Sequence, residues 1–205
     1  MSGWFPRLRD RGADDAPPPA QPRHHLLCGV DISGYSRHDQ KTQMFLRHSM
    51  YKIIKDARRA ARIPPWRCQS GDRGDGILIV ADSGIGPEMM FPAFVERAKK
   101  GVRDHNACAA RDERERMRLR MAVHAGYLQK DSRGFSGDAA NHVARLLDAP
   151  ALKGRMDEWR ADFAVVVSEA LYREVSGYHL IDPGAAFPIP VDVKETHGRA
   201  WAIIL

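Results

Sequence analysis

Two aspartates flank strand-like apolar runs and could together hold divalent metal ions. Asp31 ends the run CGVD, and Asp75 lies in a Gly-rich turn just before the run ILIV. Carboxylate oxygens suit Mg²⁺ or Mn²⁺, which bridge to the phosphates of a nucleotide. Taken singly, each aspartate is more often a turn-forming residue than a metal ligand, and Asp72 in the same turn is an alternative to Asp75. We prefer Asp75 because it adjoins the apolar run directly.

A second polar pair could act on the phosphates themselves. Asn141 and Arg145 are four residues apart in a segment whose pattern predicts a helix over residues 137–147, so they share one face of that helix. A preorganised guanidinium can stabilise charge that develops on a phosphoryl group. A solvated polar stripe is the competing interpretation, but the stripe is short and apolar residues surround it.

The bulk composition is that of a globular protein of one domain. The chain has 205 residues, 43% of them hydrophobic and 28% charged, with a formal net charge of +6 that suits an anionic partner such as a nucleotide. No apolar run approaches the ~20 residues of a membrane span. The three cysteines are an odd number without metal-type spacing, which favours a reducing cytoplasm.

The pattern of elements predicts an α+β fold. Residues 1–23 are expected to form a flexible arm and residues 24–205 the folded domain. Apolar runs, helical periodicity and alternation predict the order β-α-β-β-α-β-α-β-α-β-β. In sequence, the predicted elements cover residues 26–32, 45–61, 66–70, 76–81, 90–110, 117–123, 137–147, 162–168, 169–175, 191–195 and 200–205.

The first six elements match a ferredoxin-like βαββαβ core with additional C-terminal strands and a helix. We expect an antiparallel sheet with the helices packed on one face. The strand 26–31 and the hairpin should be central neighbours, so that Asp31 and Asp75 project near one end of the sheet. A nucleic-acid binder of this fold usually displays aromatic residues on the central strands, and here they are lacking, so no nucleic-acid partner is expected.

Four motifs in order resemble the class III nucleotidyl cyclases, the catalytic domain of adenylate and guanylate cyclases. The motifs are DISGYS, RGDGILIV, RLRMAVHAG and GDAANHVARL. The resemblance extends from about residue 26 to residue 205 and is to the small stand-alone bacterial type. It implies the class III cyclase fold and a lyase that converts a nucleoside triphosphate to a 3′,5′-cyclic nucleotide and pyrophosphate.

The resemblance also implies the roles of individual residues. Asp31 and Asp75, with the carbonyl of Ile32, would hold two Mg²⁺ or Mn²⁺ ions per site. Asn141 would orient the ribose, and Arg145 would meet the charge on the α-phosphate. The further substrate-binding residues would be Gly34, Tyr35 and Lys194, with Thr196 as an alternative to Lys194.

In this family the aspartate pair and the Asn/Arg pair of one site come from different subunits. A chain that carries all four therefore implies a homodimer with two shared active sites. No sensor or membrane segment is expected, and the enzyme should act in second-messenger signalling in the cytoplasm.

The residues that usually read the base are not those of the family. Gly71 and Gly134 occupy the positions where the family has a Lys and an Asp. Three residues of the hairpin and two of the loop before the helix could face the base instead: Gln69, Ser70, Arg73, Arg133 and Phe135. The identity of the substrate therefore stays open: it could be ATP, GTP or a pyrimidine triphosphate, as used in bacterial antiphage systems. A catalytically silent nucleotide-binding module is the alternative function.

Overall fold

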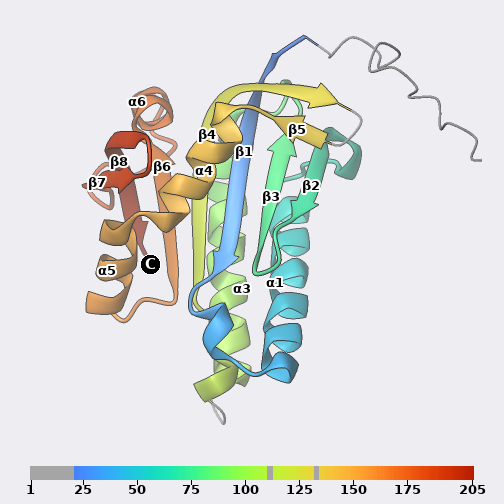
Figure 1. The fold of residues 1–205 in the computed structure, drawn as a ribbon, viewed down its shortest axis with the longest axis vertical. Helices are drawn as coiled ribbons and strands as arrows, with labels where there is room; N and C mark the ends of the chain where they lie inside the picture. The colour runs from blue at the N-terminus through green and yellow to red at the C-terminus, as the bar shows by residue number, and fades with distance from the viewer. Residues whose placement is uncertain (1–20, 110–112, 132–133) are drawn as a thin grey trace, which may run out of the picture.

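A computed structural model describes residues 21–109, 113–131 and 134–205 (Figure 1). The first strand begins at Arg23, close to the expected start of the domain. Residues 1–20 of the predicted N-terminal arm lie outside the described residues.

One mixed sheet organises the molecule, with its first strands antiparallel. The strand order is β2-β3-β1-β4-β6-β8-β7, and β5 pairs with β4 outside this path. Within it, β1 lies between β3 and β4, and both pairings are antiparallel. The strands of this half are β1 (Arg23–Ile32), β2 (Cys68–Asp72), β3 (Gly76–Ala81), β4 (Leu119–Asp131) and β5 (Gly134–Ser136). This arrangement confirms the ferredoxin-like core.

Two long helices cover one face of the sheet, behind it in Figure 1. They are α1 (Gln40–Ala60) and α3 (Val95–Cys108), the latter preceded by a short turn α2 (Pro87–Met89) and a π-helical segment (Met90–Phe94). The Asp39 carboxylate caps α1 by accepting the Thr42 N–H at 2.8 Å, which satisfies one of the free amides at the helix start. No helix in the described part of the chain combines the length and apolar composition of a membrane span.

The helices of the six-element core, α1 and α3, share one face as expected, and the opposite face carries the helices that follow the core. The helices α4 (Asp138–Asp148) and α5 (Pro150–Glu158) pack there over a second hydrophobic cluster that includes Leu27, Ala122 and Val166. Neither α5 nor the three-residue strand β5 was predicted. Only Leu152 and Met156 of α5 are buried, so its apolar periodicity is too weak to show in the sequence.

The C-terminal elements extend the sheet beyond β4. The strand β6 (Phe163–Ser168) pairs in parallel with β4, and the helix α6 (Glu169–Gly177) follows it. The hairpin of β7 (Phe187–Val193) and β8 (Thr196–Ile204) completes the edge. These are the additional C-terminal strands and helix that the sequence predicted.

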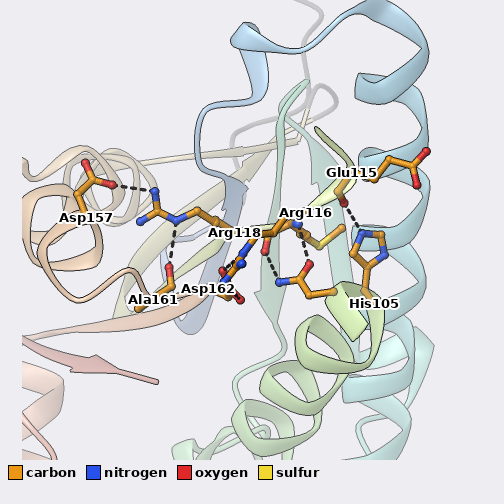
Figure 2. Close-up of polar contacts among 9 residues, drawn as sticks. His105, Glu115, Arg116, Arg118, Asp157, Ala161 and Asp162 are labelled. Atoms are coloured by element: carbon orange, nitrogen blue, oxygen red, sulfur yellow. Dashed lines mark hydrogen bonds and ion pairs between the residues drawn. The ribbon is translucent and has the colours of Figure 1, made fainter. Parts of the chain in front are cut away.

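Polar contacts fasten the start of β4, the strand next to β1 (Figure 2). Arg116 binds Asp162 through two hydrogen bonds of 2.9 Å, and Arg118 donates to the carbonyl of Ala161 at 3.0 Å. The His105 ring contacts the Glu115 carbonyl at 2.9 Å. These contacts tie the beginning of β4 to α3 and to the turn before β6, and thereby fix the side chains that β4 presents to β1.

Candidate active site

The ends of β1 and β3 bring the two predicted metal ligands together. Asp31 is the register partner of Gly76, the residue after Asp75. The Ile32 N–H also donates to the Asp75 carbonyl oxygen at 3.0 Å. Because β1 and β3 are antiparallel, the end of β1 meets the beginning of β3 (Figure 1). The register therefore puts both aspartates at the same end of the sheet.

Asp31 and Asp75 line a cavity of about 250 Å³ between the sheet and α4. Asn141 and Asp148 of α4 line it from the other side. The helix can approach β1 this closely because residue 29 is a glycine, and a Cβ there would overlap the side chain of Val143. The Asp–Asp pair and the predicted ribose-orienting Asn141 therefore border one cavity of a single chain.

A buried ion pair that the sequence did not reveal holds Asp31 in place. Its carboxylate accepts two hydrogen bonds from Arg120 of β4, from Nε at 2.8 Å and from Nη2 at 2.7 Å. Only 8% of the Arg120 side chain and 14% of the Asp31 side chain are exposed. Burial raises the pKa of Asp31 to about 6, Arg120 opposes that rise, and the nearby Asp75 adds to it. The two carboxylates are therefore within electrostatic reach of each other.

The neighbouring Asp72 is engaged in contacts with its own turn and with α1. Its carboxylate accepts the Gly74 N–H at 2.7 Å, which is the usual hydrogen bond of an Asp-containing turn, and it pairs with Arg47 of α1. Asp75 is exposed at the cavity. Asp72 shapes the hairpin, and this supports Asp75 as the second metal ligand.

Arg145 faces away from the aspartates of its own chain. It lines a separate cavity of about 700 Å³ with His142 and Thr196. Its guanidinium donates to the Thr196 hydroxyl at 2.9 Å and forms an ion pair with Glu195. Although Asn141 and Arg145 share one helix, one chain alone does not bring Arg145 to the Asp31–Asp75 cavity.

Two histidines line the same cavity as Arg145. The rings of His124 and His142 are 4.5 Å apart between centroids, and His124 Nδ1 contacts the Ser168 hydroxyl at 2.8 Å. Burial, then His142 and His24, lower the pKa of His124 to about 4. Burial and the Arg145 charge lower the pKa of His142 as well. Both rings are therefore neutral at physiological pH, so they add no positive charge beside Arg145.

The other predicted substrate-binding residues do not border the Asp31–Asp75 cavity. Gly34 and Tyr35 follow β1 in a short turn (Tyr35–Arg37), where Tyr35 packs against the core beneath α1. Lys194 is exposed in the two-residue turn between β7 and β8. Thr196, its alternative in the sequence, is the residue that binds Arg145.

The arrangement of the elements matches solved cyclase structures. The guanylyl cyclase Cya2 is 10% identical, with a TM-score of 0.63 over 90% of this chain and 92% of that one. An adenylate/guanylate cyclase/hydrolase from Silicibacter pomeroyi is 20% identical, with a TM-score of 0.61 over 91% and 99%. The chain has the class III nucleotidyl cyclase fold.

A third structure, the guanylate cyclase domain of RhGC from Catenaria anguillulae in complex with GTP, is 13% identical, with a TM-score of 0.55 over 90% of this chain and 98% of that one. No protein-family model matches the chain, and no curated protein does either. At these identities the likeness concerns the fold, which the chain shares over nearly its whole described length.

Removing one partner of the buried Asp31–Arg120 pair is expected to destabilise the fold strongly. Arg120→Met should lower the free energy of unfolding by about 3–5 kcal/mol, because it leaves the Asp31 charge buried and unpaired. Arg116→Met is the matched control: it removes an equally bidentate pair, but Arg116 is half-exposed, so we expect about 0–1 kcal/mol. Urea unfolding measures both. Equal losses would contradict the importance of burial at Arg120.

His124 should make the fold sensitive to acid. Its pKa in the folded state, about 4, is below the usual value of 6.5 for a histidine. The unfolded chain therefore binds a proton first as the pH falls, and stability is lost between about pH 7 and about pH 4. When the pH is lowered from about 7.5 to about 5, the free energy of unfolding should therefore fall by about 1 kcal/mol less in His124→Asn than in the unmodified protein. This figure allows for partial screening of the histidine by solvent.

The matched control for His124 is His179→Asn, at an exposed position with a positive φ that asparagine tolerates. In urea unfolding at the two pH values, this control should lose as much stability on acidification as the unmodified protein does. An unchanged acid sensitivity in His124→Asn would place the pH dependence elsewhere.

Proposed function

We propose that residues 24–205 form a nucleotide cyclase that converts a nucleoside triphosphate to a 3′,5′-cyclic nucleotide and pyrophosphate. The observation that carries this proposal is the meeting of Asp31 and Asp75 at one cavity, within a fold shared with adenylate and guanylate cyclases. The cyclic product would serve as a second messenger. A place in antiphage defence is part of the proposal only if the base is a pyrimidine.

The residues at the cavity fit divalent metal ions. Two carboxylates within electrostatic reach of each other form a hard oxygen donor set, and the Ile32 carbonyl is a third oxygen at the same strand end. Asp31, Asp75 and Ile32 would hold two Mg²⁺ or Mn²⁺ ions. When bound, these ions would neutralise the triphosphate and acidify the ribose 3′-hydroxyl. In that state the ions would compete with Arg120 for the oxygens of Asp31.

The protein residues would then position the reacting groups. The 3′-oxygen loses its proton to solvent and bonds to the α-phosphorus, while the bond from the α-phosphorus to the bridging oxygen breaks and pyrophosphate leaves. Asn141 would orient the ribose. Arg145 would stabilise the charge on the α-phosphate after exchanging its exposed partner Glu195 for the substrate.

The position of Arg145 favours a homodimer with shared sites. Arg145 and the Asp31–Asp75 pair line different cavities of one chain. A second copy that presents its α4 to the aspartates would complete each site, and a two-fold arrangement would give two such sites.

The base would be read by Gln69 and Phe135. Of the candidates from the sequence, these two line one cavity of about 320 Å³, where Phe135 also packs edge-to-face on His25. A glutamine amide offers both a donor and an acceptor to a base edge. Arg73 lines the Asp31–Asp75 cavity, Ser70 lies on the opposite side of β2, and Arg133 is outside the described residues.

A silent nucleotide-binding module is the second candidate function. The glycines at positions 71 and 134 favour it, because they provide no side chain where the family reads the base. Product formation distinguishes the two candidates, since a module would bind a nucleotide without converting it.

The first test is conversion of the four nucleoside triphosphates with Mn²⁺, with detection of the cyclic product by mass spectrometry. We expect one triphosphate to be cyclised. Asp75→Ala and Arg145→Ala should each lower turnover by at least about 100-fold. A refolded equal mixture of the two should recover about a quarter of the unmodified activity, because half of the dimers then hold one complete site.

Asp72→Ala is the matched control, because it removes the other carboxylate of the same hairpin and should leave the catalytic step within a few-fold of its original rate. No product from any triphosphate, with the dimer intact, would contradict catalysis. An inactive mixture in which mixed dimers are demonstrated would contradict the shared site.

Selectivity for the base provides the second test. Gln69→Ala should reduce the preference for the best triphosphate over the others by about 10-fold or more, since a hydrogen bond to a base edge is lost, while the activity on the poorest substrate changes little. Ser70→Ala, one residue away but on the other side of β2, is the control. The ratios of kcat/KM among the four triphosphates measure both, and unchanged ratios in Gln69→Ala would exclude this residue from base recognition.

A further inference from the structure

A cavity unrelated to the catalytic residues lies between α1 and the edge strand β2. Its volume is about 450 Å³, a size that accommodates a small organic molecule. It lies on the face of the sheet covered by α1, whereas the Asp31–Asp75 cavity lies on the α4 face. In Figure 1, α1 runs behind β2 and β3 along this boundary.

The rim of this cavity is positively charged and has no acidic partner. Lys52, Lys55 and Arg58 line it on successive turns of α1, with His48 one turn earlier, and no acidic side chain does. Among the described residues, none of the three cations forms an ion pair. Another arginine of the same helix does have a carboxylate partner, since Arg47 pairs with Asp72. The three cations therefore gather where the cavity opens, and one of them, Lys52, also borders a neighbouring cavity lined by Asp56 and Asp104.

The floor of the cavity is apolar. Ile54, Ile77 and Ile79 form it and are exposed by 6%, 3% and 5%, with the ring of Tyr51 beside them. These side chains are recessed between a helix and a strand and do not project from the surface. A recessed floor suits the tail of a single molecule, whereas a membrane surface is bound by projecting apolar side chains.

We propose that this cavity binds an aliphatic carboxylate, with its hydrocarbon tail on the isoleucine floor and its carboxylate between Lys52, Lys55 and Arg58. Charge complementarity selects an anionic head, and Arg58 can bind a carboxylate through two hydrogen bonds. Phosphate sites typically add backbone N–H groups from a helix N-terminus. The residues here come from the second half of α1, far from its N-terminus, which favours a carboxylate over a phosphate.

This site has a structural connection to the Asp31–Asp75 cavity. Ile77 and Ile79 of β3 line this cavity, while Ile77 and the neighbouring Leu78 also line the cavity of the aspartates. Occupancy would therefore press on the strand that begins beside Asp75. An effect on turnover rests on the proposed function, but the binding itself does not.

Calorimetric titration of the full chain with sodium decanoate, below its micelle concentration, tests the binding. Decanoate should bind at least about 10-fold more tightly than decanol, which lacks the charge, and acetate, which lacks the tail, should not bind measurably. Decyl phosphate should bind more weakly than decanoate. Vesicles of phosphatidylcholine and phosphatidylserine should not retain the protein.

Cysteine alkylation locates the binding site without reference to activity. Cys68 lines the cavity and is half-buried, and Cys108 is exposed on α3. Decanoate should slow the alkylation of Cys68 by N-ethylmaleimide, and peptide mass spectrometry measures the rate of this reaction. The rate at Cys108 provides the internal control and should not change.

Lys52→Gln/Lys55→Gln should weaken decanoate binding by about 10-fold or more, because both exposed head-group contacts are removed without disturbing the core. Lys99→Gln/Lys100→Gln on α3 makes the same change of charge and should bind as the unmodified chain does. The proposal would be overturned if decanol bound as tightly as decanoate, or if decyl phosphate bound more tightly. It would also be overturned if decanoate left Cys68 unprotected, if both double variants were weakened equally, or if the vesicles retained the protein. The absence of decanoate binding would overturn it as well. These outcomes are independent of whether any triphosphate is cyclised.

Discussion

The bidentate ion pair between Asp31 and Arg120 is the interaction on which the geometry of the site depends. The two residues are register partners on β1 and β4, and both charges are almost removed from solvent. Desolvating two charges costs several kcal/mol each, and only close, fully hydrogen-bonded pairing offsets that cost. A slip of one residue between β1 and β4 would turn one partner to the opposite face of the sheet, so the pair specifies the register as well as the position of the carboxylate.

The alternation of β1 explains how one strand serves both the core and the site. Val30 and Ile32 pack beneath α1 and α3, whereas Gly29 and Asp31 face α4. The glycine lets the helix approach, and the aspartate two residues further on then lies at the edge of that helix, where the cavity opens. Gly29 thus sets how closely α4 approaches β1, and Asp31 places a charged side chain where the resulting cavity opens.

Sequence reasoning succeeded where local pattern decides the structure and failed where pairing across the sheet does. The apolar run of β1, the periodicity of α1 and the Gly/Asp turn of the hairpin each predict their own element. Arg120 alternates with Leu119 and Met121, so the pattern places it on the polar side of a strand, which usually faces water. Only the pairing of β4 with β1 shows that this side is buried and that Asp31 is opposite. The divergence of Asn141 and Arg145 is likewise invisible in a four-residue spacing, because the neighbouring β7–β8 hairpin binds one of them.

The two charged groups that the proposed cyclase reaction needs most are held by very different partners. Arg145 pairs with Glu195, whose side chain is 77% exposed, and such a pair contributes about 0–1 kcal/mol, so a phosphate can replace the glutamate at little cost. Asp31 is held by a buried arginine, and separating that pair costs several kcal/mol unless another cation takes over the carboxylate. A substrate without cations cannot meet this requirement, because it brings only negative charge to the aspartates. The burial of the Asp31–Arg120 pair therefore makes the proposed site selective for a triphosphate that arrives together with divalent metal ions.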